Sequence, residues 1–132
     1  MNRLKLLSLL LIVPFVWING QNLNFVWLTD VHVGFDKSDS VILKQIDQIN
    51  RLDDIGFVVV TGDVSELGKW DQLEKASNLF KKINKKVFVI PGNHDVKWSE
   101  MGGMEFSQIF DDNKFRFDTL NYVFLGLNSG IV

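Results

Sequence analysis

The stretch KVFVIPGNHD, residues 86–95, decides how this chain folds. It begins with an apolar run of the kind found in strands that are buried on both faces of a sheet. Pro91 and Gly92 then end the strand, because both residues favour turns. A turn has no need of His94 and Asp95, so we expect these two side chains to serve chemistry at the strand exit.

Two further strands and two helices complete a regular alternation. The segments LNFVWLT (23–29) and FVVVT (57–61) are predicted strands by their aromatic and β-branched content. Apolar residues at helical spacing predict an amphipathic helix after each of them. The stripe of the first helix is Ile42, Ile46, Ile49 and Leu52, with Ser38 as its expected cap, and the stripe of the second is Trp70, Leu73, Ala76, Phe80 and Ile83. About thirty residues per unit match the crossover that parallel strands require, so the central sheet is expected to be mostly parallel.

The pattern changes beyond residue 96. The segment GGMEFSQIF (102–110) predicts a short helix after a glycine pair. KFRFDTLNYVFLGLN (114–128) predicts two strands joined by a tight turn near Asn121. The fold class is therefore α/β, with a hairpin toward the C-terminus.

The first twenty residues, MNRLKLLSLLLIVPFVWING, have the pattern of a secretory signal peptide. Two basic residues precede a run of thirteen mostly apolar residues, and Gly20 offers a small residue for cleavage. This run, interrupted by Pro14, is shorter than the roughly 20 residues that a bilayer span needs. We therefore expect residues 1–20 to be removed, residues 21–132 to form one incomplete domain, and the product to be secreted or periplasmic without a stable membrane anchor.

Charge and composition narrow the classes of partner. Without the two basic residues of the signal segment, twelve basic residues face sixteen acidic ones, a formal charge of −4. Such a chain has no basic surface strong enough to indicate nucleic acid. Cysteine is absent, which excludes disulfides and thiolate metal ligands.

Polar side chains follow each of the three predicted strands. The strands end in TDVHVG (29–34), TGDVSELG (61–68) and PGNHDVKW (91–98). Because the loops at the carboxyl ends of parallel strands meet at one edge of the sheet, we expect a single cluster there. Its members would be Asp30, His32, Asp63, Asn93, His94 and Asp95.

The residue types in this cluster suit a metal centre. Asp30 and His32 are two residues apart, so in an extended chain they point to the same side and can hold one ion. A glycine precedes Asp63 and another precedes Asn93, which lets the backbone approach a ligand closely. Carboxylate, imidazole and amide oxygen together suit divalent manganese, iron or zinc. Two such ions would outweigh the two carboxylates in charge and favour an anionic substrate, of which phosphate esters are the obvious class.

The motifs DVH (30–32), GDVSE (62–66) and GNHD (92–95), in this order, resemble those of the calcineurin-like metallophosphoesterases. The predicted hairpin is similar to one that follows in many members. This resemblance implies a four-layer α/β/β/α fold, of which the chain would hold the N-terminal part. It also implies hydrolysis of phosphate mono- or diesters, as small-molecule substrates, at a site with two divalent metal ions and a bridging hydroxide as nucleophile.

Carried over position by position, the resemblance implies a role for each residue of the cluster. The metal ligands would be Asp30, His32, Asp63 and Asn93, with Asp63 bridging the two ions. His94 would act on the phosphate as general acid or charge stabiliser, and Asp95 would orient its ring. Glu66 stands where purple acid phosphatases have a metal-binding Tyr, so we expect it behind the ligands or at the surface.

Members of this family complete the site with a further His and a later GHxH motif, whereas this chain has only His32 and His94. We therefore expect an incomplete fragment that binds metal weakly and hydrolyses slowly. Two alternatives are open. One is a catalytically inactive domain that keeps the sheet and binds an anion or a protein, and the other is an oligomer whose partner chains supply the imidazoles. The exact substrate, the metal and the oligomeric state are not determined by these residues.

Overall fold

The structure is a computed structural model that describes residues 22–130, so the predicted signal peptide lies outside the described residues. The elements follow in the order β1 (Phe25–Thr29), α1 (Ser38–Asn50), β2 (Phe57–Thr61), α2 (Trp70–Phe80), β3 (Lys86–Ile90), α3 (Asn93–Lys97), α4 (Met104–Phe110), β4 (Phe115–Thr119) and β5 (Tyr122–Gly126). Within this part of the chain, no helix has the length and apolar content to cross a membrane.

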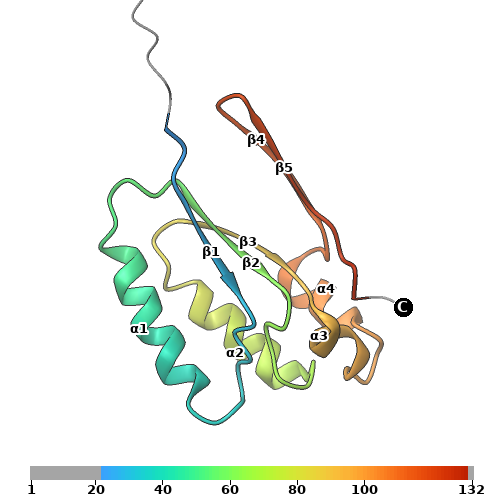
Figure 1. Cartoon of the computed structure of the whole chain (residues 1–132). Coiled ribbons are helices and arrows are strands. Elements are labelled where there is room, and N and C mark those ends of the chain that lie inside the picture. Colours follow the sequence, from blue (N-terminus) through green and yellow to red (C-terminus); the bar gives the residue numbers. More distant parts are fainter. Residues whose placement is uncertain (1–21, 131–132) are drawn as a thin grey trace, which may run out of the picture.

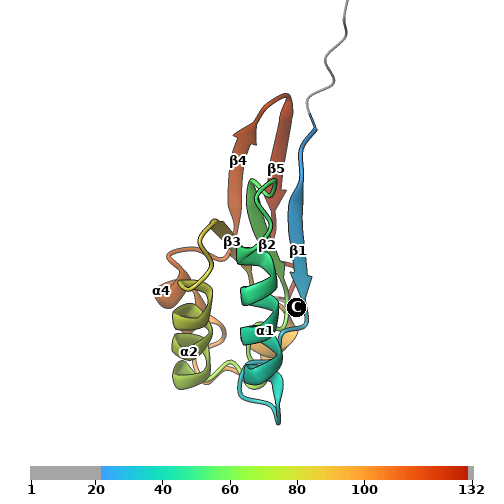
Figure 2. The same ribbon diagram turned by 90° about the vertical axis from the view of Figure 1, so that its left-hand side faces the viewer.

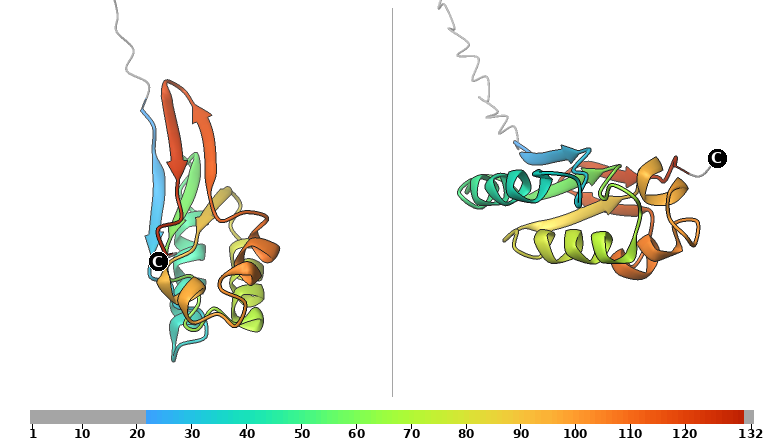
Figure 3. Two further views of the ribbon diagram at one scale, coloured as in Figure 1. Left: turned by 90° about the vertical axis from the view of Figure 1, so that its right-hand side faces the viewer. Right: turned by 90° about the horizontal axis from the view of Figure 1, so that it is seen from below.

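Three strands form a parallel sheet in the order β1-β2-β3, which confirms the predicted topology. Helices α1 and α2 cover one face of this sheet, and the antiparallel hairpin β4-β5 packs on the other (Figure 1, Figure 2, Figure 3). The described residues therefore form three layers, α/β/β, in agreement with the N-terminal part of the expected fold.

The helical face of the sheet forms an aliphatic core. Val58 and Val60 of β2 are fully buried against the stripes of α1 and α2. Both predicted stripes are confirmed at their centres and fail at one end. Leu52 lies beyond α1 and is 43% exposed, and Trp70 is the first residue of α2 and is 47% exposed. The expected cap is also wrong, because Ser38 is the first helical residue and Lys37 holds the cap position.

The other face of the sheet is aromatic. Phe57 of β2 lies 4.8 Å from Phe117 of β4 and 5.0 Å from Phe124 of β5, measured between ring centroids, in edge-on geometry. Phe88 of β3 stacks on Phe117 at 3.7 Å. Aromatic pairs of this kind add to the burial of their area, so they hold the hairpin against the parallel sheet.

The segment before α4 supports the short helix α3. Glu105 is 4% exposed, and its carboxylate accepts hydrogen bonds from the Ser99 hydroxyl at 2.8 Å and the Met101 N–H at 2.9 Å. Burial alone would raise the pKa of Glu105. The hydrogen bonds from Ser99, Met101 and other backbone N–H groups together lower it by more, so the pKa lies below the ordinary value of 4.5. These hydrogen bonds hold the loop before α4 in place, and Gly103 in this loop lies close to Val96 of α3.

Substituting Glu105→Gln tests this contribution. Because its pKa is depressed in the folded state, the carboxylate stabilises the fold above about pH 4.5, and this stabilisation is lost as the pH falls through the folded pKa. We expect urea denaturation at pH 7 to give the variant a free energy of unfolding lower by on the order of 1 kcal/mol, and this difference to shrink below about pH 4.5. The exposed Glu100→Gln serves as the control, and a deficit that does not change with pH would contradict the assignment.

Candidate metal centre

The loops that follow β1 and β2 continue the pairing of their strands. The N–H of His32 donates to the carbonyl oxygen of Asp63 at 2.9 Å, and the N–H of Val33 donates to that of Val64 at 2.9 Å. These backbone hydrogen bonds hold the two loops side by side beyond the ends of the strands. The polar side chains that they carry are consequently fixed next to one another.

Asp30, His32 and Asp63 come together as the sequence predicts. Each offers a ligand atom, and these atoms all lie within 4.8 Å of one another. His32 Nε2 is 3.9 Å from Asp63 Oδ2, which is too long for a hydrogen bond and wide enough to admit an ion bonded to both at about 2.0–2.2 Å. Two carboxylates and an imidazole suit manganese, iron or zinc, so the residues fit the metal that the resemblance implies.

Asn93 reaches the same place from the third strand exit. Together with Asp30 and Asp63 it lines a cavity of about 310 Å³, which Ser129 and Gly130 also border after β5. One predicted ligand from each strand exit therefore lines this cavity, whereas His32 lines the neighbouring cleft between β1 and α1. Sequence reasoning did not place Ser129 and Gly130 at the cavity, because nothing in their residue types indicates a ligand.

Three of the expected ligands have an unusual backbone. Asp30, His32 and Asp63 adopt φ angles of 54°, 48° and 44°, in the left-handed region that residues with a Cβ seldom occupy. Such conformations cost on the order of 1–3 kcal/mol each and gather at functional sites. Three of the six non-glycine residues with positive φ in the described part of the chain therefore lie in this cluster. The extended chain expected between Asp30 and His32 is wrong, because β1 ends at Thr29 and both residues adopt left-handed backbone.

The glycine before Asn93 is required by packing. A Cβ at Gly92 would overlap the backbone nitrogen and Oδ1 of Asp63. The expectation that a glycine permits close approach here is confirmed. Gly62 has a φ of 76° and thus turns the chain directly before Asp63, as its position in the motif predicts.

The buried side chain of Asp95 connects the loops that follow β2 and β3 by hydrogen bonds. Its carboxylate is fully buried and accepts hydrogen bonds from the N–H groups of Val64, Ser65 and Gly92 and from the Ser65 hydroxyl, at 2.7–2.9 Å. Burial raises the pKa of Asp95, and the hydrogen bonds oppose this rise. The expectation that Asp95 orients the His94 ring is wrong, because both carboxylate oxygens are taken by these donors. Asp95 instead positions the loops that carry the ligands.

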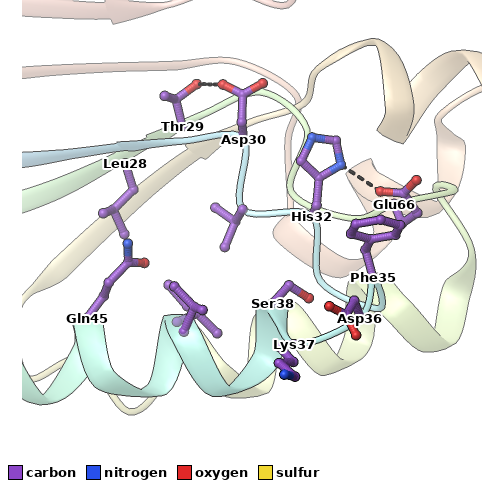
Figure 4. Close-up of a pocket in the computed structure, with 13 residues that line it drawn as sticks. Leu28, Thr29, Asp30, His32, Phe35, Asp36, Lys37, Ser38, Gln45 and Glu66 are labelled. Carbon is purple, nitrogen blue, oxygen red and sulfur yellow. Dashed lines mark hydrogen bonds and ion pairs between the residues drawn. The ribbon is translucent and has the colours of Figure 1, made fainter.

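Glu66 takes the part that was expected of Asp95. Its carboxylate oxygen Oε2 lies 2.8 Å from Nδ1 of His32 (Figure 4), and its backbone carbonyl oxygen lies 2.6 Å from Nδ1 of His94. The two imidazole rings meet edge to face, with centroids 4.9 Å apart. Glu66 therefore lies behind His32, one of the two positions expected for it, and also contacts His94. The sequence did not indicate these partners, because His32 is 34 residues away.

These contacts determine which ring nitrogens carry hydrogen. A carboxylate and a carbonyl oxygen can only accept, so Nδ1 is the donor in both His32 and His94. The Nε2 atom of neutral His32 then presents its lone pair, as a metal ligand must. For His94, Nε2 is the nitrogen that is free to exchange a proton.

A sequence model of the calcineurin-like phosphoesterase family matches residues 23–131. The chain belongs to this family. It is 26% identical over 87 residues to the uncharacterized metallophosphoesterase-like protein YydB of Bacillus subtilis (strain 168), a match that covers 58% of this chain and 18% of that protein. The chain thus spans less than a fifth of the length of this curated relative.

Among solved structures, this calcineurin-like phosphoesterase chain is similar to the cold-active protein-tyrosine phosphatase of a psychrophile, Shewanella sp.. The TM-score is 0.31 at 18% identity, over 68% of this chain and 33% of that one. The family assignment therefore depends on the family match and the motifs, and not on this likeness.

Substituting Gly92→Ala in this family member should displace Asp63. The added methyl group overlaps its backbone, and such overpacking costs about 1–3 kcal/mol of unfolding free energy. We expect a lower urea midpoint and weaker Mn²⁺ binding by calorimetry. Gly56→Ala is the control, since its Cβ would meet only Asn24 O, at an ordinary 3.7 Å. Equal effects of the two variants would contradict the close approach.

Substituting Glu66→Ala should weaken Zn²⁺ binding by about tenfold, because losing the partner of a ligating imidazole costs 10–100-fold in affinity. Nitrogen NMR of the His32 ring should show the hydrogen moving away from Nδ1. Glu66→Gln keeps an acceptor and should lose less, and the exposed Glu74→Ala should lose nothing. An unchanged His32 tautomer in Glu66→Ala would refute this role.

Proposed function

We propose that this protein hydrolyses phosphate mono- or diesters at a site for two divalent metal ions, after export through its N-terminal segment. The observation that carries the proposal is the convergence of Asp30, His32 and Asp63, whose ligand atoms lie within 4.8 Å of one another on left-handed backbone. Membership of the calcineurin-like phosphoesterase family supports the reaction class.

The charge of the cluster supports a metal-dependent reaction. Asp30, Asp63 and Glu66 gather three carboxylates beside two histidines. Without cations this edge would repel a phosphate ester, since like charges at short range disfavour binding. Bound divalent ions would supply the opposing charge and activate a water molecule as nucleophile.

The protein's own groups have separate duties in this proposal. Asp30, His32 and Asp63 would hold and orient the metal ions, together with Asn93 in the adjoining cavity. His94 keeps a hydrogen on Nδ1, which donates to the carbonyl oxygen of Glu66, so in the imidazolium form the second hydrogen is on Nε2 and can pass to the departing alkoxide. Proton transfer of this kind contributes typically 10²–10⁴-fold to a rate.

Substituting Asp63→Asn tests the proposal directly. We expect the unaltered chain to bind Mn²⁺ weakly and to hydrolyse bis(p-nitrophenyl) phosphate slowly, and the variant to lose at least about tenfold in both, because it removes a charged ligand. Asp53→Asn is the matched control, an exposed Asp to Asn change on the loop before β2.

The two readouts separate the candidate functions. A hydrolysis rate that does not depend on Mn²⁺ would exclude a metal centre at these residues. Equal Mn²⁺ affinity and hydrolysis rate in the Asp63 and Asp53 variants would exclude it as well. Metal binding with no hydrolysis of mono- or diesters would favour the inactive anion-binding domain. Native mass of the Mn²⁺-loaded chain would show whether partner chains are needed to complete the site.

A further inference from the structure

We infer that a cleft beside the metal ligands receives a compact apolar group of the substrate, so that the preferred substrate is a phosphoester of a ring-sized apolar alcohol or phenol. This inference rests on the proposed function and deepens it. The cleft lies between β1 and α1 and has a volume of about 590 Å³ (Figure 4). That volume is within the range of sites for small organic ligands.

The cleft has an apolar part, beside polar side chains that include Asp36, Lys37, Ser38 and Gln45. Leu28 and Val31 line it from the strand side, Val41 from α1, and Phe35 from the loop between them. Phe35 is 59% exposed and Val41 is 51% exposed. An aromatic and a branched side chain left open to solvent in one hollow indicate a surface that gains free energy when an apolar group covers it.

The same cleft includes three residues of the metal centre. Asp30, His32 and Glu66 form part of its lining, and Figure 4 shows them at the end where β1 leaves the sheet. A phosphate bound through metal ions at Asp30 and His32 would therefore have its ester group near the entrance to the cleft. Apolar wall and metal ligands are continuous, so one molecule can contact both.

The cavity on the other side of the centre has a different lining. Small residues and backbone, including Gly62, Gly92, Ser129 and Gly130, border it together with the apolar Ile90 and Pro91. Backbone groups hydrogen-bond to anions, so much of this lining suits the oxygens of a phosphate. A second apolar hollow, bordered by Trp27, Ile90 and Leu127, contains none of the expected metal ligands. The cleft between β1 and α1 is the apolar surface that also includes Asp30 and His32.

Isothermal titration of the whole chain, with Mn²⁺ present, compares two phosphonates that cannot be hydrolysed as esters. Methylphosphonate probes the metal centre alone, and phenylphosphonate probes the centre and the cleft. We expect phenylphosphonate to bind about tenfold more tightly, from partial burial of its ring. The double variant Phe35→Ala with Val41→Ala should lose this preference and keep its affinity for methylphosphonate.

A matched double variant guards against a general effect of lost apolar surface. Tyr122→Ala with Val123→Ala also removes one aromatic and one valine side chain, exposed by 55% and 57%, from the hairpin strand β5. It should retain the full preference for phenylphosphonate. Circular dichroism of both double variants checks that the fold is unchanged.

Each result decides between the two levels of the proposal. Equal affinities for the two phosphonates, or a preference that survives Phe35→Ala with Val41→Ala, would overturn the cleft and leave the metal centre standing. A preference lost equally in the β5 variant would overturn it as well. If neither phosphonate binds in the presence of Mn²⁺, the proposed function fails, and this inference fails with it.

Discussion

The carboxylate of Asp95 is the interaction on which the candidate site depends. It is buried, and its two oxygens accept four hydrogen bonds from the loops that follow β2 and β3. A loop between strands ordinarily has its polar groups in water, where they are free to move. Here one buried carboxylate accepts hydrogen bonds from both loops in place of water. Asp63 and Asn93, the expected ligands, are held in place because the residues next to them donate to Asp95.

The strained backbone of the expected ligands is restrained by contacts within the same loops. Asp30, His32 and Asp63 occupy left-handed backbone, which the chain would leave if nothing opposed it. The opposing restraints are the hydrogen bonds between the two loops and the contact of Gly92 with Asp63. The aromatic side chains between the hairpin and the parallel sheet pack the two layers together, away from these residues.

The sequence predicted the strands best and the contacts between loops least. β2 and β3 begin and end where expected, because uninterrupted apolar runs stop at Thr61 and Ile90 with glycine or proline close behind. The helix α3 was missed, since GNHD has the composition of a turn and becomes helical only when Asp95 bonds back to Gly92. The cluster of expected ligands followed from the parallel topology and the residue types at the strand exits, whereas the contacts of Glu66 depend on a partner 34 residues away.

The pairing of loops that continues past β1 and β2 has a consequence for how this edge can vary. Val33 and Ser65 form an isolated bridge, so the ladder of backbone hydrogen bonds runs on through the motif residues. Adding or removing one residue in this ladder would break the match between the two loops and separate the side chains that they bring together. The number of residues between Gly62 and Glu66 is therefore constrained by the backbone, in addition to the residue types required at Gly62 and Ser65.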